Sequence, residues 1–222
     1  MTEDLILIGA GGSAGDIVWM VEELNRISPR WRLRGFLDDD PAKQGTSVCG
    51  LPVLGPIAAA VDHDGARFVV GIAHYRRPLV RAAIAERLNL PRERFATLVH
   101  PSASVSPHAS VGVGCLVFQN VLICHAASVG DHAFLSPYSI VSHDAVVEDG
   151  STMAPGALLC GGVRLGAGAY AGAQCVIKDG ITIGPGAVAG IGSVVIRDVE
   201  AHGIVVGNPA RSIPGRSKRG CS

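Results

Sequence analysis

The chain has 222 residues, enough for two modest domains, and its 19 basic residues balance its 19 acidic ones. This balance gives no electrostatic basis for binding nucleic acid or an anionic membrane. No apolar run approaches the roughly twenty residues of a membrane span and no signal peptide is recognisable, so a cytoplasmic protein is expected. The six cysteines form no CxxC motif, which predicts reduced thiols, with Cys115 and Cys175 as small core residues.

Residues 1–97 predict a small α/β domain of the Rossmann-like βαβ type. An apolar run at 5–8 predicts a strand, a glycine-rich loop covers 9–15, and apolar residues spaced by three and four from Ile17 to Leu24 predict a helix. Further strands are expected at 33–37 and 68–73. Helical spacing covers 78–90, and residues 53–57 predict the start of another helix.

The loop from Gly9 to Gly15 admits two interpretations. Strand, glycine loop and helix together form the layout that directs backbone N–H groups and a helix N-terminus at phosphate, but the same sequence can be a tight turn without a ligand. Asp38 and Asp39 end the second strand, where a ribose or base is read in such folds. NAD would need a larger fold of two halves, so a mononucleotide or a nucleotide sugar fits this domain better.

A six-residue period fills the chain from Leu98 to Val199, as seventeen sixes without an insertion. The second position of each six is aliphatic and the sixth is small or β-branched. A fixed short period is typical of a solenoid, in which each unit buries its apolar side only against the next unit. Six residues suit a short strand and a turn, and Gly and Pro at positions three to five supply the turns.

This repeat resembles that of the hexapeptide-repeat acyltransferases. The resemblance implies a left-handed parallel β-helix with three sixes in each coil, so that residues eighteen apart stack at the strand spacing of about 4.8 Å. The glycine loop and Phe36-Leu37-Asp38-Asp39 ahead of it make the chain similar to the bacterial nucleotide-sugar acetyltransferases of the sialic-acid and bacillosamine type. We therefore expect a nucleotide-sugar-binding domain over 1–97, a β-helix acetyltransferase domain over 98–199 and a C-terminal extension over 200–222.

The resemblance also implies site residues. His143, followed by Asp144, would act as general base on the incoming amine or hydroxyl, because imidazole titrates near working pH and a carboxylate can fix its tautomer. Acetyl-CoA would lie in a groove between subunits of a homotrimer, along small residues and cations: Gly161, Gly162, Ala171, Gly172, Lys178, Arg197 and Arg211. The nucleotide sugar would contact Gly9, Gly11, Gly12, Ser13, Asp38, Asp39, His125 and Ser136.

Three positions depart from the family pattern, namely Ser13, Ser136 and Thr152. The latter two border the expected sugar pocket, so the sugar can differ from that of the best-known members. Gly207 to Arg211 matches the stretch that follows the last coil in these enzymes.

The leading prediction is N-acetylation of a UDP- or dTDP-linked amino sugar by direct transfer, with no metal. O-acetylation of a sugar is its close neighbour, because the same base serves both acceptors. A rival is a zinc lyase resembling the carbonic anhydrases built on this repeat, which bind zinc between subunits. His125 and His143 would then be two ligands, and His132 or His108 of the neighbouring subunit the third. A nucleotide-binding scaffold is a third alternative. His108 and His132 are otherwise expected at the surface.

Overall fold

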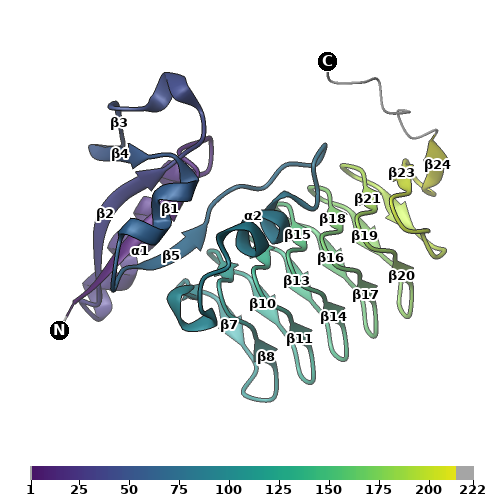
Figure 1. The fold of residues 1–222 in the computed structure, drawn as a ribbon. Helices are drawn as coiled ribbons and strands as arrows, with labels where there is room; N and C mark the ends of the chain where they lie inside the picture. The colour runs from purple at the N-terminus through teal and green to yellow at the C-terminus, as the bar shows by residue number, and fades with distance from the viewer. Residues whose placement is uncertain (1, 214–222) are drawn as a thin grey trace.

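The computed structural model describes residues 2–213, which form an α/β domain and a long three-sided β-helix (Figure 1). The predicted order of the two folds is thereby confirmed. Neither α-helix in this part of the chain is long and apolar enough to cross a membrane. The end of the predicted C-terminal extension, residues 214–222, lies outside the described residues.

The N-terminal domain is built on a five-stranded sheet in the order β3-β4-β2-β1-β5, parallel except for β3. Its elements are β1 (Glu3–Ile8), α1 (Ala14–Ile27), β2 (Trp31–Leu37), η1 (Pro41–Lys43), β3 (Ser47–Val48), β4 (Leu51–Gly55), η2 (Ile57–Asp62), β5 (Arg67–Val70), α2 (Val80–Leu88) and η3 (Arg92–Arg94). The strands β1 and β5 are almost wholly buried, as expected for a sheet covered on both faces.

One sequence prediction in this domain was wrong. Residues 53–57 do not begin an α-helix: residues 53–55 end β4, and the 3-10 helix η2 begins only at Ile57. Strand β4 fits closely beside β2 because Gly35 has no side chain; a Cβ there would lie 2.3 Å from the carbonyl oxygen of Pro52. The short β3–β4 hairpin escaped prediction because it contains too few residues to set up a period.

The β-helix consists of two-residue strands, one in each six. They are β6 (Leu98–Val99), β7 (Ser104–Val105), β8 (Ser110–Val111), β9 (Leu116–Val117), β10 (Leu122–Ile123), β11 (Ser128–Val129), β12 (Phe134–Leu135), β13 (Ile140–Val141), β14 (Val146–Val147), β15 (Thr152–Met153), β16 (Leu158–Leu159), β17 (Arg164–Leu165), β18 (Tyr170–Ala171), β19 (Val176–Ile177), β20 (Thr182–Ile183), β21 (Val188–Ala189) and β22 (Val194–Val195). Each strand from β6 to β19 pairs in parallel with the strand eighteen residues on, as Ile140 does with Leu158. The predicted coil of three sixes is confirmed.

Three sheets form the sides of the column. We call β6, β9, β12, β15, β18 and β21 the first face, β7 to β22 in steps of three the second face, and β8 to β20 in steps of three the third face. Beyond the last six, β23 (Ile204–Val206) extends the first face in parallel, and β24 (Arg211–Ile213) closes it antiparallel. The first corner follows the first face along the chain, and the second and third corners follow their faces likewise.

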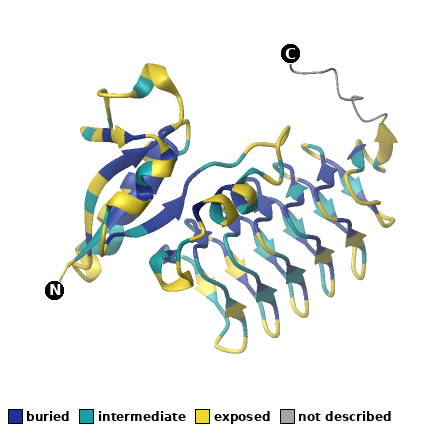
Figure 2. Cartoon of the chain, in the orientation of Figure 1, coloured by how far each residue is buried: buried dark blue, intermediate teal, exposed yellow. Residues whose placement is uncertain are grey.

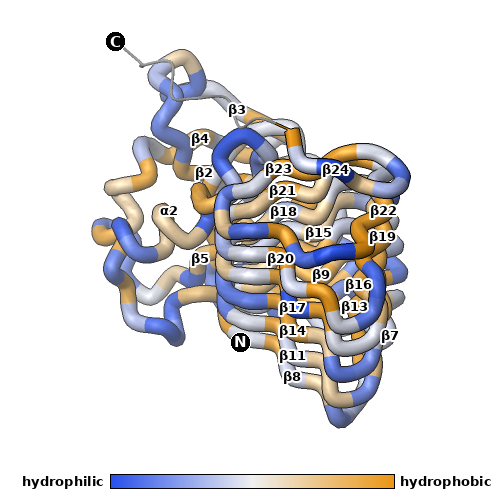
Figure 3. Tube along the Cα trace, turned by 90° about the vertical axis from the view of Figure 1, so that its right-hand side faces the viewer, coloured by the Kyte–Doolittle hydropathy of each residue, from blue (hydrophilic) through white to orange (hydrophobic). Residues whose placement is uncertain are grey.

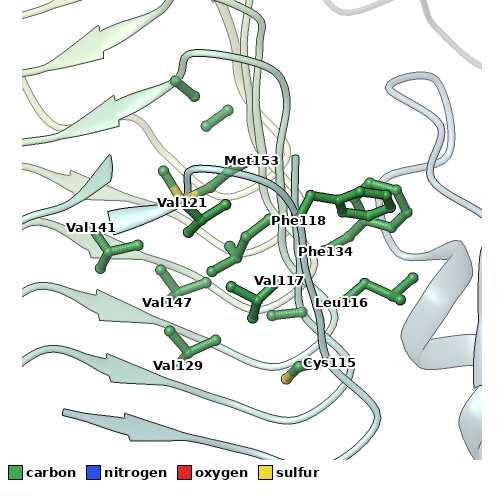
Figure 4. Packing of buried hydrophobic residues seen from close by; sticks show 14 of the residues in the cluster. Cys115, Leu116, Val117, Phe118, Val121, Val129, Phe134, Val141, Val147 and Met153 are labelled. Carbon is green, nitrogen blue, oxygen red and sulfur yellow. The ribbon is translucent and has the colours of Figure 1, made fainter. Parts of the chain in front are cut away.

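The second residue of each six points into the column, and the outward residue gives each face its character. Val117, Val129, Val141 and Val147 are buried inside, and such aliphatic side chains contribute about 1.5–3 kcal/mol each when fully buried. Figure 4 shows these valines within the coils, while Phe118 and Phe134 project to the other side of the chain trace. In Figure 2, buried residues follow the strands and exposed residues gather at the turns.

The outward positions differ between the faces. On the first face, Leu116 and Phe134 are buried under the N-terminal domain. On the second face they form an apolar column that nothing in residues 2–213 covers completely: Leu122, Ile140, Leu158, Val176 and Val194. Figure 3 shows hydrophobic colour along β19 and β22 of this face. On the third face they are mostly polar, as with Ser110 and Arg164.

Candidate functional site

The glycine loop begins at Gly9, whose backbone requires glycine. Gly9 has φ +101°, and a Cβ there would lie 2.3 Å from Cγ1 of Ile72, so the loop rests directly on the chain that leaves β5. Gly11 and Gly12 are exposed, and a Cβ on either would meet nothing within 4 Å. Ser13 precedes α1 without making a side-chain cap. The loop therefore presents bare backbone at the helix N-terminus, an arrangement that can accept a phosphate.

Asp38 holds this loop from the end of β2. The backbone N–H groups of Ala10 and Asp40 donate to its carboxylate at 2.8 and 2.9 Å, and Lys43 Nζ lies 2.8 Å from Oδ2. Burial acts to raise the pKa of Asp38, but Lys43 and the two N–H groups outweigh it and lower that pKa below its ordinary value. Both carboxylate oxygens are thus already engaged within the chain.

Asp39 is likewise bonded within the domain. It accepts a hydrogen bond from the N–H of Ile57 at 2.8 Å and pairs with Arg87 at 2.8 Å. Half of its side chain remains exposed, so it can also contact a ligand beside the loop.

A cavity of about 240 Å³ lies between the glycine loop and the β-helix. We call it the interdomain cavity; its lining residues are Ser13, Asp16, Ala73, Phe118, Phe134, Ser136, Pro137, Thr152, Ala154, Pro155 and Tyr170. The structure thus brings Ser13 of the first domain and Ser136 of the second together, with Thr152 beside them. Its walls combine aromatic rings with hydroxyl groups, a surface that suits a sugar.

Sequence reasoning missed the aromatic walls and Asp16. Phe118 is the third residue of its six, while Phe134 and Tyr170 occupy outward first positions. A repeat identifies these positions as outward, but it does not say which domain will cover them.

His143 and Asp144 lie at the second corner, between the second and third faces. Nδ1 of His143 is 2.8 Å from Oδ2 of Asp144, and both side chains are about two-thirds exposed, at 67% and 65%. Asp144 adopts the left-handed conformation, with φ 59°, and donates its N–H to the carbonyl of His125. With the Nδ1 proton directed at the carboxylate, Nε2 keeps a lone pair that can accept a proton, and it lies beside Gly161 of the next coil.

Gly161 lies one coil above His143 and makes room for its ring. A Cβ on Gly161 would lie 2.5 Å from Cε1 of the imidazole. Its φ is not in the left-handed region, so the missing side chain matters for space rather than for backbone freedom.

Gly161→Ala is therefore expected to displace the His143 ring without unfolding the coil. If His143 is the general base that the sequence predicts, kcat should fall by about tenfold, because small displacements of a group that takes a proton are costly. Steady-state kinetics and a thermal melt measure the two effects, and an unchanged kcat with an unchanged melting temperature would show that the ring position does not matter.

The remaining histidines occupy different surroundings. His125 stacks one coil below His143, but its ring meets that of exposed His108 edge-on, with 4.8 Å between centroids. His132 is not a surface residue as expected: its ring is half-buried at the third corner, edge-on to Phe95 at 4.7 Å, and its Nδ1 is buried without a hydrogen-bond partner. Within residues 2–213, no three or more His, Cys, Asp or Glu side chains gather as a metal site would require.

The expected acetyl-CoA residues fall into two groups. Gly161, Gly162, Lys178 and Arg197 follow the second corner upward from His143, and both cations are exposed. Gly172 follows the first corner, two coils above Ser136, and Arg211 lies exposed in β24.

One residue of this set is placed differently from the prediction. Ala171 is fully buried inside the column, because it occupies the inward second position of its six, so its methyl group cannot line a surface groove. Gly172 is also needed by the fold itself, since a Cβ there would lie 2.7 Å from the backbone of the next coil.

Comparisons with known proteins cover both domains. Residues 4–88 match the PglD N-terminal domain family. No curated protein matches the sequence. The acetyltransferase domain of PglB from Neisseria gonorrhoeae FA1090, in complex with acetyl coenzyme A, is 28% identical with a TM-score of 0.83, over 96% of this chain and 100% of that one.

Two further solved structures are similar over the same extent. One is a histidine-to-alanine variant of GDP-perosamine N-acetyl transferase from Caulobacter crescentus, in complex with CoA and GDP-perosamine. It is 27% identical, with a TM-score of 0.80 over 96% of this chain and 97% of that one. WeeI from Acinetobacter baumannii AYE is 26% identical, with a TM-score of 0.73 over 96% and 100%. These likenesses confirm the predicted left-handed parallel β-helix.

Proposed function

Because residues 4–88 belong to the PglD N-terminal domain family and the whole chain shares its fold with hexapeptide-repeat sugar acetyltransferases, we propose that the protein N-acetylates a nucleotide-linked amino sugar. The acetyl donor is acetyl-CoA, and the acceptor is a 4-amino-deoxysugar joined to UDP or dTDP. The observation that carries the proposal is the exposed His143–Asp144 pair on a β-helix. The predicted resemblance to sugar acetyltransferases is confirmed by the likenesses.

The reaction follows from the orientation of the pair. The sugar amine attacks the thioester carbonyl while Nε2 of His143 takes its proton, and Asp144 stabilises the imidazolium that forms. The carbon–sulfur bond then breaks, an amide remains on the sugar, and the imidazolium returns its proton to the CoA thiolate. Backbone N–H groups along the groove stabilise the oxyanion. No acyl-enzyme is needed, and a hydroxyl acceptor would use the same base.

The two substrates approach from different sides. The glycine loop and Asp39 hold the nucleotide, and the sugar enters the interdomain cavity, whose Phe134 and Tyr170 offer flat apolar walls. Lys178, Arg197 and Arg211 are exposed cations that can meet the phosphates of CoA. Two of the similar structures contain acetyl-CoA or CoA, and one of these also contains GDP-perosamine, which supports this division.

A homotrimer completes the site. The interdomain cavity opens at the first corner, whereas His143 lies at the second corner, across the full width of the second face. The outward column of that face, from Leu122 to Val194, is apolar and only partly buried. Three copies that pack these faces around a three-fold axis would bury the column and bring the His143 of one copy to the cavity of the next.

The purified protein is expected to release CoA thiol from acetyl-CoA only when an amino sugar is present. A panel of UDP-, dTDP- and GDP-linked 4-amino sugars, with the matching 4-hydroxy sugars as controls, separates amine from hydroxyl acceptors. Thiol release and mass spectrometry of the product are the measurements. If no sugar of either kind stimulated release, while stoichiometric zinc copurified and was lost on His125→Ala, the proposal would give way to the zinc lyase.

A further inference from the structure

Arg81 is a fully buried cation at the junction of the two domains. It lies on α2 with no exposed surface, and no carboxylate within residues 2–213 pairs with it. Its guanidinium donates to backbone carbonyls instead: Nε to that of His132 at 2.8 Å, and Nη1 to those of Val70 and Ile72. Nη2 is buried without a partner. Burial lowers the pKa of Arg81 to about 10, which leaves it charged at neutral pH.

Burying an unpaired charge is costly, so the segments that the Arg81 guanidinium holds together indicate what the residue contributes. Val70 ends β5. Two residues later, the side chain of Ile72 packs against Gly9 of the glycine loop. On the other side, His132 belongs to the third corner of the β-helix, two residues before Phe134, whose ring forms part of the interdomain cavity. Cζ of Arg81 lies 5.1 Å from the centroid of the Phe134 ring.

The helix that carries Arg81 is itself seated closely on the third corner. A Cβ on Gly150 would lie 2.9 Å from Cβ of Ala82, and one on Gly168 would lie 2.3 Å from Cδ2 of Leu79. Both glycines also have a left-handed backbone, with φ 67° at Gly150 and 60° at Gly168. The glycines of the third corner thus set how closely α2 approaches the β-helix. Arg81 links that position of α2 to the backbone beneath the glycine loop.

We propose that Arg81 is a positioning residue that sets the separation of the glycine loop from Phe134, and so the width of the cavity that holds the acceptor sugar. That the cavity holds a sugar rests on the proposed function. The link that Arg81 makes between the two domains does not depend on it. Other contacts also join the domains: His100 and Glu23 lie 2.6 Å apart between the first coil and α1, and the Tyr75 and Tyr170 rings lie 6.4 Å apart. Arg81 differs from these in bonding directly to the backbone that follows β5, beneath the glycine loop.

Arg81→Met is the test, because methionine keeps apolar bulk and removes every donor. We expect KM for the nucleotide sugar to rise by about tenfold, with KM for acetyl-CoA and the acetylation rate at saturation changing by less than about twofold. Arg81→Lys keeps the positive charge but loses the planar set of guanidinium donors. Its KM for the nucleotide sugar should lie between those of wild type and Arg81→Met.

Arg94 provides a matched control. It also donates to two backbone carbonyls, those of Ala66 and His63, both at 2.7 Å, and its Cζ lies 5.3 Å from the ring of Phe68. All three partners belong to the N-terminal domain, so Arg94→Met removes similar contacts without touching the junction. It should lower the melting temperature without raising KM for the nucleotide sugar. Equal KM changes in the two variants would overturn the proposal, because both would then report only lost stability.

Hydrogen exchange supplies a readout that needs no substrate. Arg81→Met should speed amide exchange in residues 9–15 and 70–75, whereas Arg94→Met should speed it around 63–68. If wild type acetylated no sugar of the panel, the proposed function would fail and exchange would still decide the role of Arg81. Unchanged exchange in the glycine loop of Arg81→Met would refute the linkage.

Discussion

His143→Ala is expected to lower kcat by a factor of about 10² to 10⁴, because the attacking amine would lose the group that takes its proton. Binding of acetyl-CoA should remain largely intact, since the exposed imidazole belongs to no packed core. Steady-state kinetics with the active sugar gives the first quantity, and calorimetric titration with CoA gives the second.

His202→Ala is the matched control for this experiment. His202 is also an exposed histidine at a turn of the column, but it lies at the third corner near the end of the β-helix. It should retain wild-type kcat. A His143→Ala enzyme with undiminished turnover would remove the base from the proposed mechanism, and equal losses in both variants would point to a general effect of removing a turn side chain.

Much of the β-helix could be predicted because the position of a residue within its six determines whether its side chain points into the column, whatever the rest of the chain does. The inward position of Val141 follows from its place in the six, and so does the place of His143 at a turn, eighteen residues above His125. The same rule identifies Ala171 as inward, which contradicts its expected place in the acetyl-CoA groove. Where family resemblance and the repeat disagreed about a residue, the geometry of the repeat held.

What could not be predicted depends on how the two domains meet. Arg81 looks in the sequence like any charged residue of an amphipathic helix, and only the docking of α2 on Gly150 and Gly168 buries it. His132 occupies the same place in its six as exposed His108, yet Phe95 covers it. The interdomain cavity was missed for the same reason, because its walls come from segments that no period relates.

The first and second faces of the column differ in what covers them. The first face is covered by the N-terminal domain and forms the cavity with it. The second face is apolar, and it separates that cavity from His143 by a whole side of the column. Since one chain cannot bring the two together without leaving its fold, the proposed chemistry requires a neighbouring copy.

A mixed trimer is expected to recover activity that both of its parents lack. Ser13→Trp would fill the interdomain cavity from its rim at little cost to the fold, because the Ser13 side chain makes no capping hydrogen bond. His143→Ala would leave the cavity open and remove the base. Each variant alone should be nearly inactive.

Coexpression of the two variants with different tags, followed by purification on both tags, selects trimers that contain both chains. Every such trimer, whether two to one or one to two, has one seam at which an open cavity of one copy meets an intact His143 of the next. We therefore expect about a third of the wild-type rate from the mixed trimer, in keeping with a cyclic three-fold arrangement. A site built within one chain would give none, because each chain would carry one defect, and a mixed trimer as inactive as its parents would refute the shared site.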